Sequence, residues 1–189
     1  MNLANKITVT RILLIPLFMI FLLSQRIQPF GSYIAAVIFS IAAFTDTVDG
    51  YVARFQKRVT IFGQVLDPLA DKLLISAALI ALVELARLSA WIALVIIARE
   101  FAVSGLRLMA VAENKIIVPS SLGKLKTLSQ IIAVIAIILN LPIFIAGKSL
   151  GWVLMAIAVI FTIISGMEYF MKAKGILEIS FLSNSPLGK

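Results

Sequence analysis

The chain contains no cysteine and no histidine among its 189 residues. The missing cysteines exclude disulfide bonds and thiolate metal sites, so they leave the redox compartment open. The missing histidines exclude imidazole as a metal ligand and as an acid–base catalyst. Any proton transfer must therefore use a carboxylate, a lysine, a tyrosine or water.

Acidic residues are scarce, and basic residues outnumber them. The chain has 9 Asp and Glu against 17 Lys and Arg, a formal net charge of +8. The basic residues are scattered between apolar spans and form no stripe with aromatic residues, so we expect no nucleic-acid partner. In a hydrophobic chain this excess is typical of cytoplasmic loops and of contact with anionic membrane lipids.

Hydrophobic residues make up 61% of the chain, and its mean hydropathy is +1.09. Soluble domains are about half apolar, so this composition indicates an integral membrane protein. Each of six apolar spans is about long enough to cross a hydrocarbon core of roughly 30 Å. The spans cover residues 7–25, 33–54, 67–86, 90–111, 126–146 and 150–171. We expect an all-α integral membrane fold, a six-transmembrane-helix bundle, with a single domain over 1–189 and a loose tail at 176–189.

Basic residues between the spans predict the orientation of this bundle. Most of them fall on the side that carries both termini. The loops on the opposite side carry only Arg26, Arg87 and Lys148. The positive-inside rule then places both termini in the cytoplasm, in a multi-pass protein of the cell membrane.

All four aspartates lie within 26 residues of this apolar chain. A carboxylate at the centre of a membrane helix costs roughly 2.5–3.5 kcal/mol, so four of them require compensating cations. Hard divalent metals are the simplest compensation, because they prefer oxygen ligands. Asp46 and Asp49 share a face of the second expected helix, and Asp67 and Asp71 share a face of the third. If these helices pack antiparallel, the carboxylates converge beneath the cytoplasmic surface and could hold two ions for phosphoryl transfer.

Small residues and one arginine occupy the same helix faces. Gly50, Ala53 and Gly63 leave room for a flat ligand against the backbone, although small residues also serve simply for close helix packing. Arg54 suits a diphosphate by its charge and fork geometry, or it anchors the helix at the cytoplasmic surface.

These residues form one pattern, Asp46-x2-Asp49-Gly50-x2-Ala53-Arg54-x8-Gly63-x3-Asp67-x3-Asp71. The pattern resembles, at every position, the signature of the CDP-alcohol phosphotransferases. The resemblance implies a six-helix membrane enzyme, usually a homodimer, with its active site at the cytoplasmic side. It also implies that an acceptor hydroxyl attacks the β-phosphorus of a CDP-lipid and releases CMP.

The resemblance also implies roles for single residues. The four aspartates would bind two Mg²⁺ or Mn²⁺ ions, and Asp71 would be the general base that deprotonates the acceptor. Residues implied to bind the CDP-lipid are Asn5, Thr8, Gly50, Ala53, Arg54 and Gly63. The N-terminal pair belongs to Asn5-x2-Thr8-x2-Arg11, which resembles the amphipathic start of family members. Its alternative interpretation is an interfacial cap with a snorkelling arginine.

Four further cations bear on the acceptor: Arg99, Arg107, Lys124 and Lys126. Several cations around one pocket favour an acceptor that is itself a phosphate over serine, choline or ethanolamine. The segments 98–101, 104–107 and 123–127 resemble the family branch that makes phosphatidylglycerophosphate. We therefore expect transfer of the phosphatidyl group from CDP-diacylglycerol to sn-glycerol 3-phosphate.

Several alternatives stay open. Arg99 could form a structural ion pair with Glu100, and the two lysines could be membrane anchors. Inositol, inositol phosphate or phosphatidylglycerol could replace the acceptor. A divalent-cation transporter would also use acidic residues, but it would spread them across the membrane depth, whereas these lie at one end.

Overall fold

Helices make up most of the computed structural model, which describes residues 3–56, 61–112, 121–145 and 147–183. Side-chain surroundings are described for 8–45, 69–111, 122–145 and 147–174. The α-helices of these segments are α1 (Leu3–Leu23), α2 (Phe30–Gln56), α3 (Ile61–Glu84), α4 (Ala90–Ala112), α5 (Ser121–Leu139) and α6 (Leu150–Ser183). A short 3₁₀ turn, η1 (Gln25–Ile27), joins α1 to α2, and a hairpin of β1 (Phe144–Ile145) and β2 (Lys148–Ser149) joins α5 to α6.

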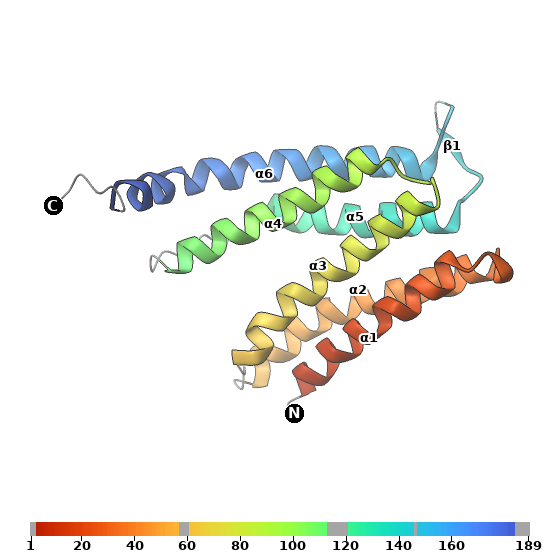
Figure 1. Cartoon of the computed structure of the whole chain (residues 1–189), viewed down its shortest axis with the longest axis horizontal. Helices are drawn as coiled ribbons and strands as arrows, with labels where there is room; N and C mark the ends of the chain where they lie inside the picture. The colour runs from red at the N-terminus through yellow and green to blue at the C-terminus, as the bar shows by residue number, and fades with distance from the viewer. Residues whose placement is uncertain (1–2, 57–60, 113–120, 146, 184–189) are drawn as a thin grey trace.

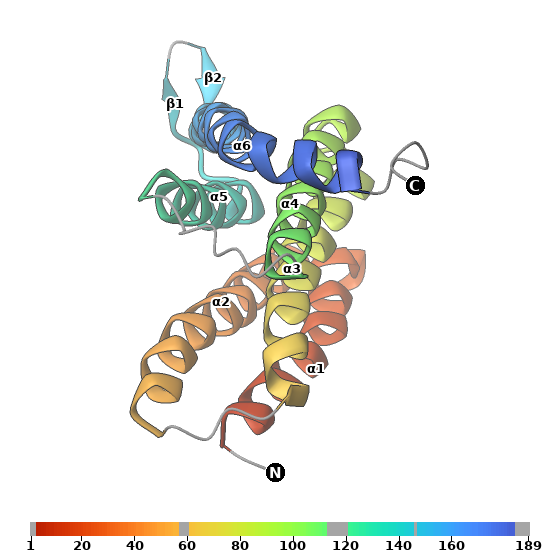
Figure 2. The same ribbon diagram turned by 90° about the vertical axis from the view of Figure 1, so that its left-hand side faces the viewer.

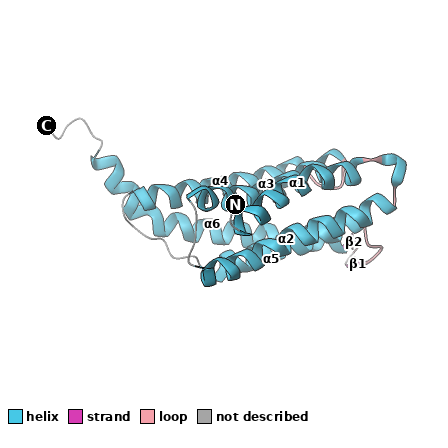
Figure 3. Cartoon of the chain, turned by 90° about the horizontal axis from the view of Figure 1, so that it is seen from below, coloured by secondary structure: helices cyan, strands magenta, loops and turns pink. Residues whose placement is uncertain are grey.

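The helices run alternately up and down in two groups of three (Figure 1). In Figure 1, α1, α2 and α3 form an inclined group below α4, α5 and α6. The groups meet where α2 contacts α5 and where α3 contacts α4. The start of α1, the end of α2 and the start of α3 lie at the lower edge of the molecule, and the end of α6 lies at its left-hand end (Figure 1). The hairpin lies at the opposite end, which we call the hairpin end (Figure 3).

Small side chains allow the helices to approach closely. Fully buried alanines line the contacts between helices, among them Ala35, Ala42, Ala78, Ala133 and Ala158. Large apolar residues such as Phe30 and Trp91 are instead 74% and 76% exposed. Because large exposed apolar surfaces are rare on soluble monomers, this pattern is that of a protein surrounded by lipid.

Two helices are long and apolar enough to cross a membrane within the part of the chain that the structure describes. They are Leu122–Leu139 and Leu150–Lys174, and Thr8–Leu23 and Phe30–Thr45 are shorter apolar segments. The six expected helices are therefore present. Within the described residues, two of them meet the length and hydropathy criteria for a membrane span.

The expected helix over 126–146 is wrong in its last third, because α5 ends at Leu139. Asn140 adopts the left-handed conformation (φ 46°), which asparagine tolerates at a helix end. Pro142 follows, and proline both lacks an N–H and disfavours helical backbone in the residue before it. The chain then turns through the hairpin at Gly147, whose φ is +75°.

The last helix is longer than expected. It continues to Ser183 and does not end near residue 171, so 176–183 is helical where a loose tail was expected. Gly175 lies inside it, but one glycine costs a helix only about 1 kcal/mol relative to alanine. Residues 184–189 lie outside the described part of the chain.

Candidate active site

The aspartate motif lies on two helices as predicted. Asp46 and Asp49 belong to the last turns of α2, and Asp67 and Asp71 to the first half of α3. Figure 2 shows the end of α2 and the start of α3 at the lower end of the bundle, on opposite sides of it. Two helices therefore bring the motif to one end of the molecule.

Of the four carboxylates, only Asp71 has a described side chain. It is partly buried and lies within electrostatic range of the Lys126 ammonium on α5. The side chains of the other three lie outside the described residues, and no trio of acidic metal ligands occurs among the side chains that are described. Convergence of the four carboxylates therefore stays a prediction.

Most residues expected to bind the CDP-lipid also have side chains outside the described residues: Asn5, Gly50, Ala53, Arg54 and Gly63. The exception is Thr8, which is 1% exposed. Arg11 is equally buried, and its Nε donates a hydrogen bond of 3.2 Å to the Ala42 carbonyl of α2. The interpretation of Arg11 as a snorkelling arginine is therefore wrong, because a backbone carbonyl inside the bundle accepts its hydrogen bond.

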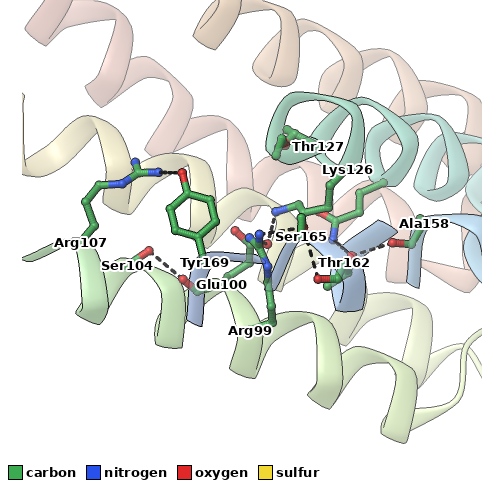
Figure 4. A network of polar contacts seen from close by, with 12 residues as sticks. Arg99, Glu100, Ser104, Arg107, Lys126, Thr127, Ala158, Thr162, Ser165 and Tyr169 are labelled. Carbon is green, nitrogen blue, oxygen red and sulfur yellow. Dashed lines mark hydrogen bonds and ion pairs between the residues drawn. The ribbon is translucent and has the colours of Figure 1, made fainter. Parts of the chain in front are cut away.

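An ion-pair network joins α4 to α5 (Figure 4). Glu100 accepts hydrogen bonds from Arg99, at 3.4 Å, and from Lys126. These side chains are 16%, 12% and 4% exposed, respectively. The ion pair that the sequence left open for Arg99 and Glu100 is thus present, and Lys126 completes it from another helix.

Tyr169 of α6 joins this network to Arg107 (Figure 4). Its hydroxyl accepts a hydrogen bond of 2.9 Å from Arg107, and its ring lies 5.7 Å from the Arg107 guanidinium and 5.9 Å from that of Arg99. Both distances are within the range of cation–π attraction. Tyr169 therefore holds two arginines, which lie about two turns apart on α4, against one aromatic ring.

Serine and threonine side chains complete the network on α6. Ser165 accepts a hydrogen bond of 2.8 Å from Arg99, and Thr162 accepts one of 2.9 Å from Gln130 of α5. We call Arg99, Glu100, Arg107, Lys126, Ser165 and Tyr169 the α4–α6 cluster. Lys124 has an exposed side chain one turn before Thr127 and is not part of this cluster.

The α4–α6 cluster carries excess positive charge. It holds the cations Arg99, Arg107 and Lys126 and the single carboxylate Glu100. The buried Nε of Arg99 has no hydrogen-bond acceptor among the described residues. Positive charge with an unused N–H donor is suited to binding an anion such as a phosphate.

Sequence reasoning found the cations but missed their partners. Tyr169, Ser165, Thr162 and Gln130 were not proposed as site residues. Thr162, Ser165 and Tyr169 recur at i, i+3 and i+7 in an otherwise apolar helix. That spacing is a polar stripe on one helix face, and it is the signal that could have identified them.

The fold and the cluster define a class: an all-helical membrane protein with its ionisable residues gathered between helices. Within that class, the chain belongs to the CDP-alcohol phosphatidyltransferase family, whose model matches residues 1–164. The resemblance stated from the aspartate pattern is thereby confirmed.

Relatives from several bacteria match nearly the whole chain. A CDP-diacylglycerol--glycerol-3-phosphate 3-phosphatidyltransferase of Bacillus subtilis is 48% identical over 182 residues, which cover 90% of this chain and 94% of the relative. A protein of the same name from Rickettsia bellii is 38% identical, covering 92% and 96%. A probable phosphatidylglycerophosphate synthase of Mycobacterium tuberculosis is 38% identical, covering 91% and 81%.

Proposed function

We propose that this protein transfers the phosphatidyl group of CDP-diacylglycerol to sn-glycerol 3-phosphate, giving phosphatidylglycerophosphate and CMP. The observation that carries the proposal is the 48% identity, over nine-tenths of the chain, to a relative named for this reaction. The excess of cations in the α4–α6 cluster supports it independently, because the acceptor is itself a phosphate.

Asp46, Asp49, Asp67 and Asp71 are the residues that we propose to hold two Mg²⁺ or Mn²⁺ ions. The donor set fits such ions, because carboxylate oxygens are the ligands they prefer and the chain offers no histidine or cysteine. When bound, a pair of divalent ions stabilises the attacking and leaving oxygens of an in-line phosphoryl displacement.

Asp71 is proposed as the general base. It would take the proton from the acceptor hydroxyl as that oxygen forms a bond to the β-phosphorus of the CDP-lipid. The bond from the β-phosphorus to the oxygen bridging to CMP then breaks, and CMP leaves with the bonding electrons. The partial exposure of Asp71 supports this role, since a base must reach a soluble acceptor.

The CDP-lipid would lie against α1, α2 and α3. Gly50, Ala53 and Gly63 would admit the cytidine ring against the backbone, and Arg54 would hold the diphosphate. Asn5 and Thr8 would approach the nucleotide from α1. The buried position of Thr8 supports a place inside the bundle.

The acceptor phosphate would be held by Arg99, Arg107, Lys124 and Lys126. Arg99 and Lys126 already share Glu100, so their charge is only partly neutralised in the absence of the acceptor. Arg107, held on the Tyr169 ring, would present its remaining guanidinium donors to the phosphate. Lys124, which is exposed, would attract the acceptor at the entrance.

In the membrane we propose that both termini and the aspartate motif face the cytoplasm, that the six helices span the cell membrane, and that the protein is a homodimer. The charge distribution between the helices supports this orientation.

Release of CMP from CDP-diacylglycerol, measured with each acceptor in turn, tests the reaction. We expect release with glycerol 3-phosphate and Mg²⁺, and little with inositol, inositol phosphate or phosphatidylglycerol. If CMP is released with another acceptor only, that acceptor replaces glycerol 3-phosphate as the proposed substrate. Absence of release with every acceptor, together with divalent-ion flux in proteoliposomes, would favour the transporter instead.

A further inference from the structure

A cavity at the hairpin end lies far from the α4–α6 cluster. It has a volume of about 110 Å³ and is lined by residues of the α3–α4 turn, of the end of α5 and of the start of α6, including Arg87, Asn140, Ser149, Gly151 and Trp152. Lys126 and Leu139 are 13 residues apart on α5, so about 20 Å of helix separates the cluster from this cavity. No residue proposed for the reaction lines it.

The cavity lies where two candidate membrane spans end. The apolar part of α5 stops at Leu139, and that of α6 begins at Leu150. Asn140 and Ser149, which line the cavity, immediately follow and precede these spans. Trp152 is 45% exposed, and tryptophan is enriched at the membrane–water interface. The cavity is therefore at the depth of lipid headgroups.

Positive charge and N–H donors surround the cavity. One Arg87 Nη donates to the carbonyl of Ile138, at 3.0 Å, and among the described residues this is the single hydrogen bond that its five N–H donors make. The Lys148 ammonium lies 3.8 Å above the Trp152 ring, beside the cavity. Gly151 and Trp152 belong to the first turn of α6, where backbone N–H groups lack helical acceptors. Glu84, one turn before Arg87, is the nearest acidic residue in the sequence, and it does not line the cavity.

We propose that this cavity binds the phosphate of an anionic phospholipid headgroup. Arg87 would pair with the phosphate through its remaining donors, and Lys148 would move from the tryptophan face onto the same anion. Ser149 and Asn140 would contact the polar part of the headgroup, while the acyl chains would follow the exposed apolar faces of α5 and α6. In the proposed orientation, this site faces the outer leaflet and is separate from the reaction at the other end.

Trp152 provides a direct test in the full-length protein. The chain has two tryptophans, so Trp91→Phe leaves Trp152 as the single indole. In detergent, we expect its emission to change saturably with dihexanoyl-phosphatidylglycerol and not with dihexanoyl-phosphatidylcholine or inorganic phosphate. An equal response to phosphatidylcholine would overturn the preference for an anionic lipid, and an equal response to inorganic phosphate would show a site for a free anion.

Arg87→Gln and Lys148→Gln should each weaken the response about tenfold, which corresponds to ~1.4 kcal/mol for the lost charged contact. Arg26→Gln is the matched control, since Arg26 is an exposed cation in η1 that does not line the cavity. Because Lys148 is exposed, its variant remains informative if Arg87→Gln fails to fold. Equal affinities in Lys148→Gln, Arg26→Gln and the parent would refute the site. CMP release in the same variants should be unchanged, because none of these residues is proposed for the reaction. If the wild-type protein releases no CMP, that result contradicts the proposed reaction and not the lipid site.

Discussion

Replacement of Glu100 by glutamine tests whether the α4–α6 cluster is held together by charge. Glutamine keeps the shape of the side chain and removes its negative charge. Lys126 would then lie 4% exposed next to Arg99, and the more distant Asp71 would be the carboxylate left within its electrostatic range. Removing one partner of a buried ion pair costs about 3–5 kcal/mol, because the other charge stays uncompensated.

The lower end of that range applies here. Glu100 is 16% exposed, so water already screens part of the interaction, and Arg99 keeps its hydrogen bond to Ser165. We therefore expect a loss of about 3 kcal/mol in the free energy of unfolding. For a chain of this size, each kcal/mol corresponds to about 2–4 °C, so the unfolding temperature should fall by about 6–12 °C.

Thermal unfolding in detergent, followed by circular dichroism, measures this change. Glu84→Gln is the matched control, because Glu84 is an exposed carboxylate at the hairpin end, and it should alter stability by less than about 0.5 kcal/mol. The double variant Glu100→Gln/Lys126→Met should be more stable than Glu100→Gln alone, since it removes the stranded ammonium. If the double variant loses more free energy of unfolding than the two single variants lose together, the reasoning is refuted.

Four further outcomes are expected. Tyr169→Phe should raise the KM for glycerol 3-phosphate about fivefold with kcat little changed, as loss of ~1 kcal/mol of hydrogen bonding to Arg107 predicts; an altered KM for the CDP-lipid alone would contradict it. Asp71→Asn should abolish CMP release while CDP-lipid binding, measured by calorimetry, persists; wild-type rates would remove Asp71 from the mechanism. EDTA should stop CMP release and Mg²⁺ or Mn²⁺ restore it, and activity that survives exhaustive chelation would refute the proposed metal site. Gly151→Ala should lower the unfolding temperature, because its Cβ would lie 2.8 Å from the Ile137 side chain and 3.1 Å from its backbone nitrogen, and an unchanged temperature would mean that α5 and α6 separate easily there.

The number and order of the helices could be predicted because each is a long apolar segment bounded by polar residues. The bounds were less predictable where a few residues decide them. Apolar composition continues past Leu139, so hydropathy alone extends α5, although Asn140 and Pro142 end it. Lys172, Lys174 and Gly175 interrupt the apolar pattern, so hydropathy likewise ends the span near residue 171, although α6 continues to Ser183.

The partners within the α4–α6 cluster could not be predicted from local sequence, because they are distant along the chain. Arg99 and Ser165 are 66 residues apart, and Arg107 and Tyr169 are 62 apart. Helical spacing shows which residues share a face of one helix, but it does not show which faces of two helices meet. The cations could therefore be identified from their charge, whereas the tyrosine and serine that hold them required the arrangement of α4 against α6.

The hydrogen bond between Arg11 and Ala42 has a consequence for how this protein can vary. Ala42 lies one helical turn before Asp46, so the Arg11 guanidinium binds α2 one turn before the first acidic residue of that helix. Any shift of α1 along the bundle would pull on that turn. The N-terminal helix thereby fixes the position of the turn that precedes the acidic motif, and shortening it should displace that motif.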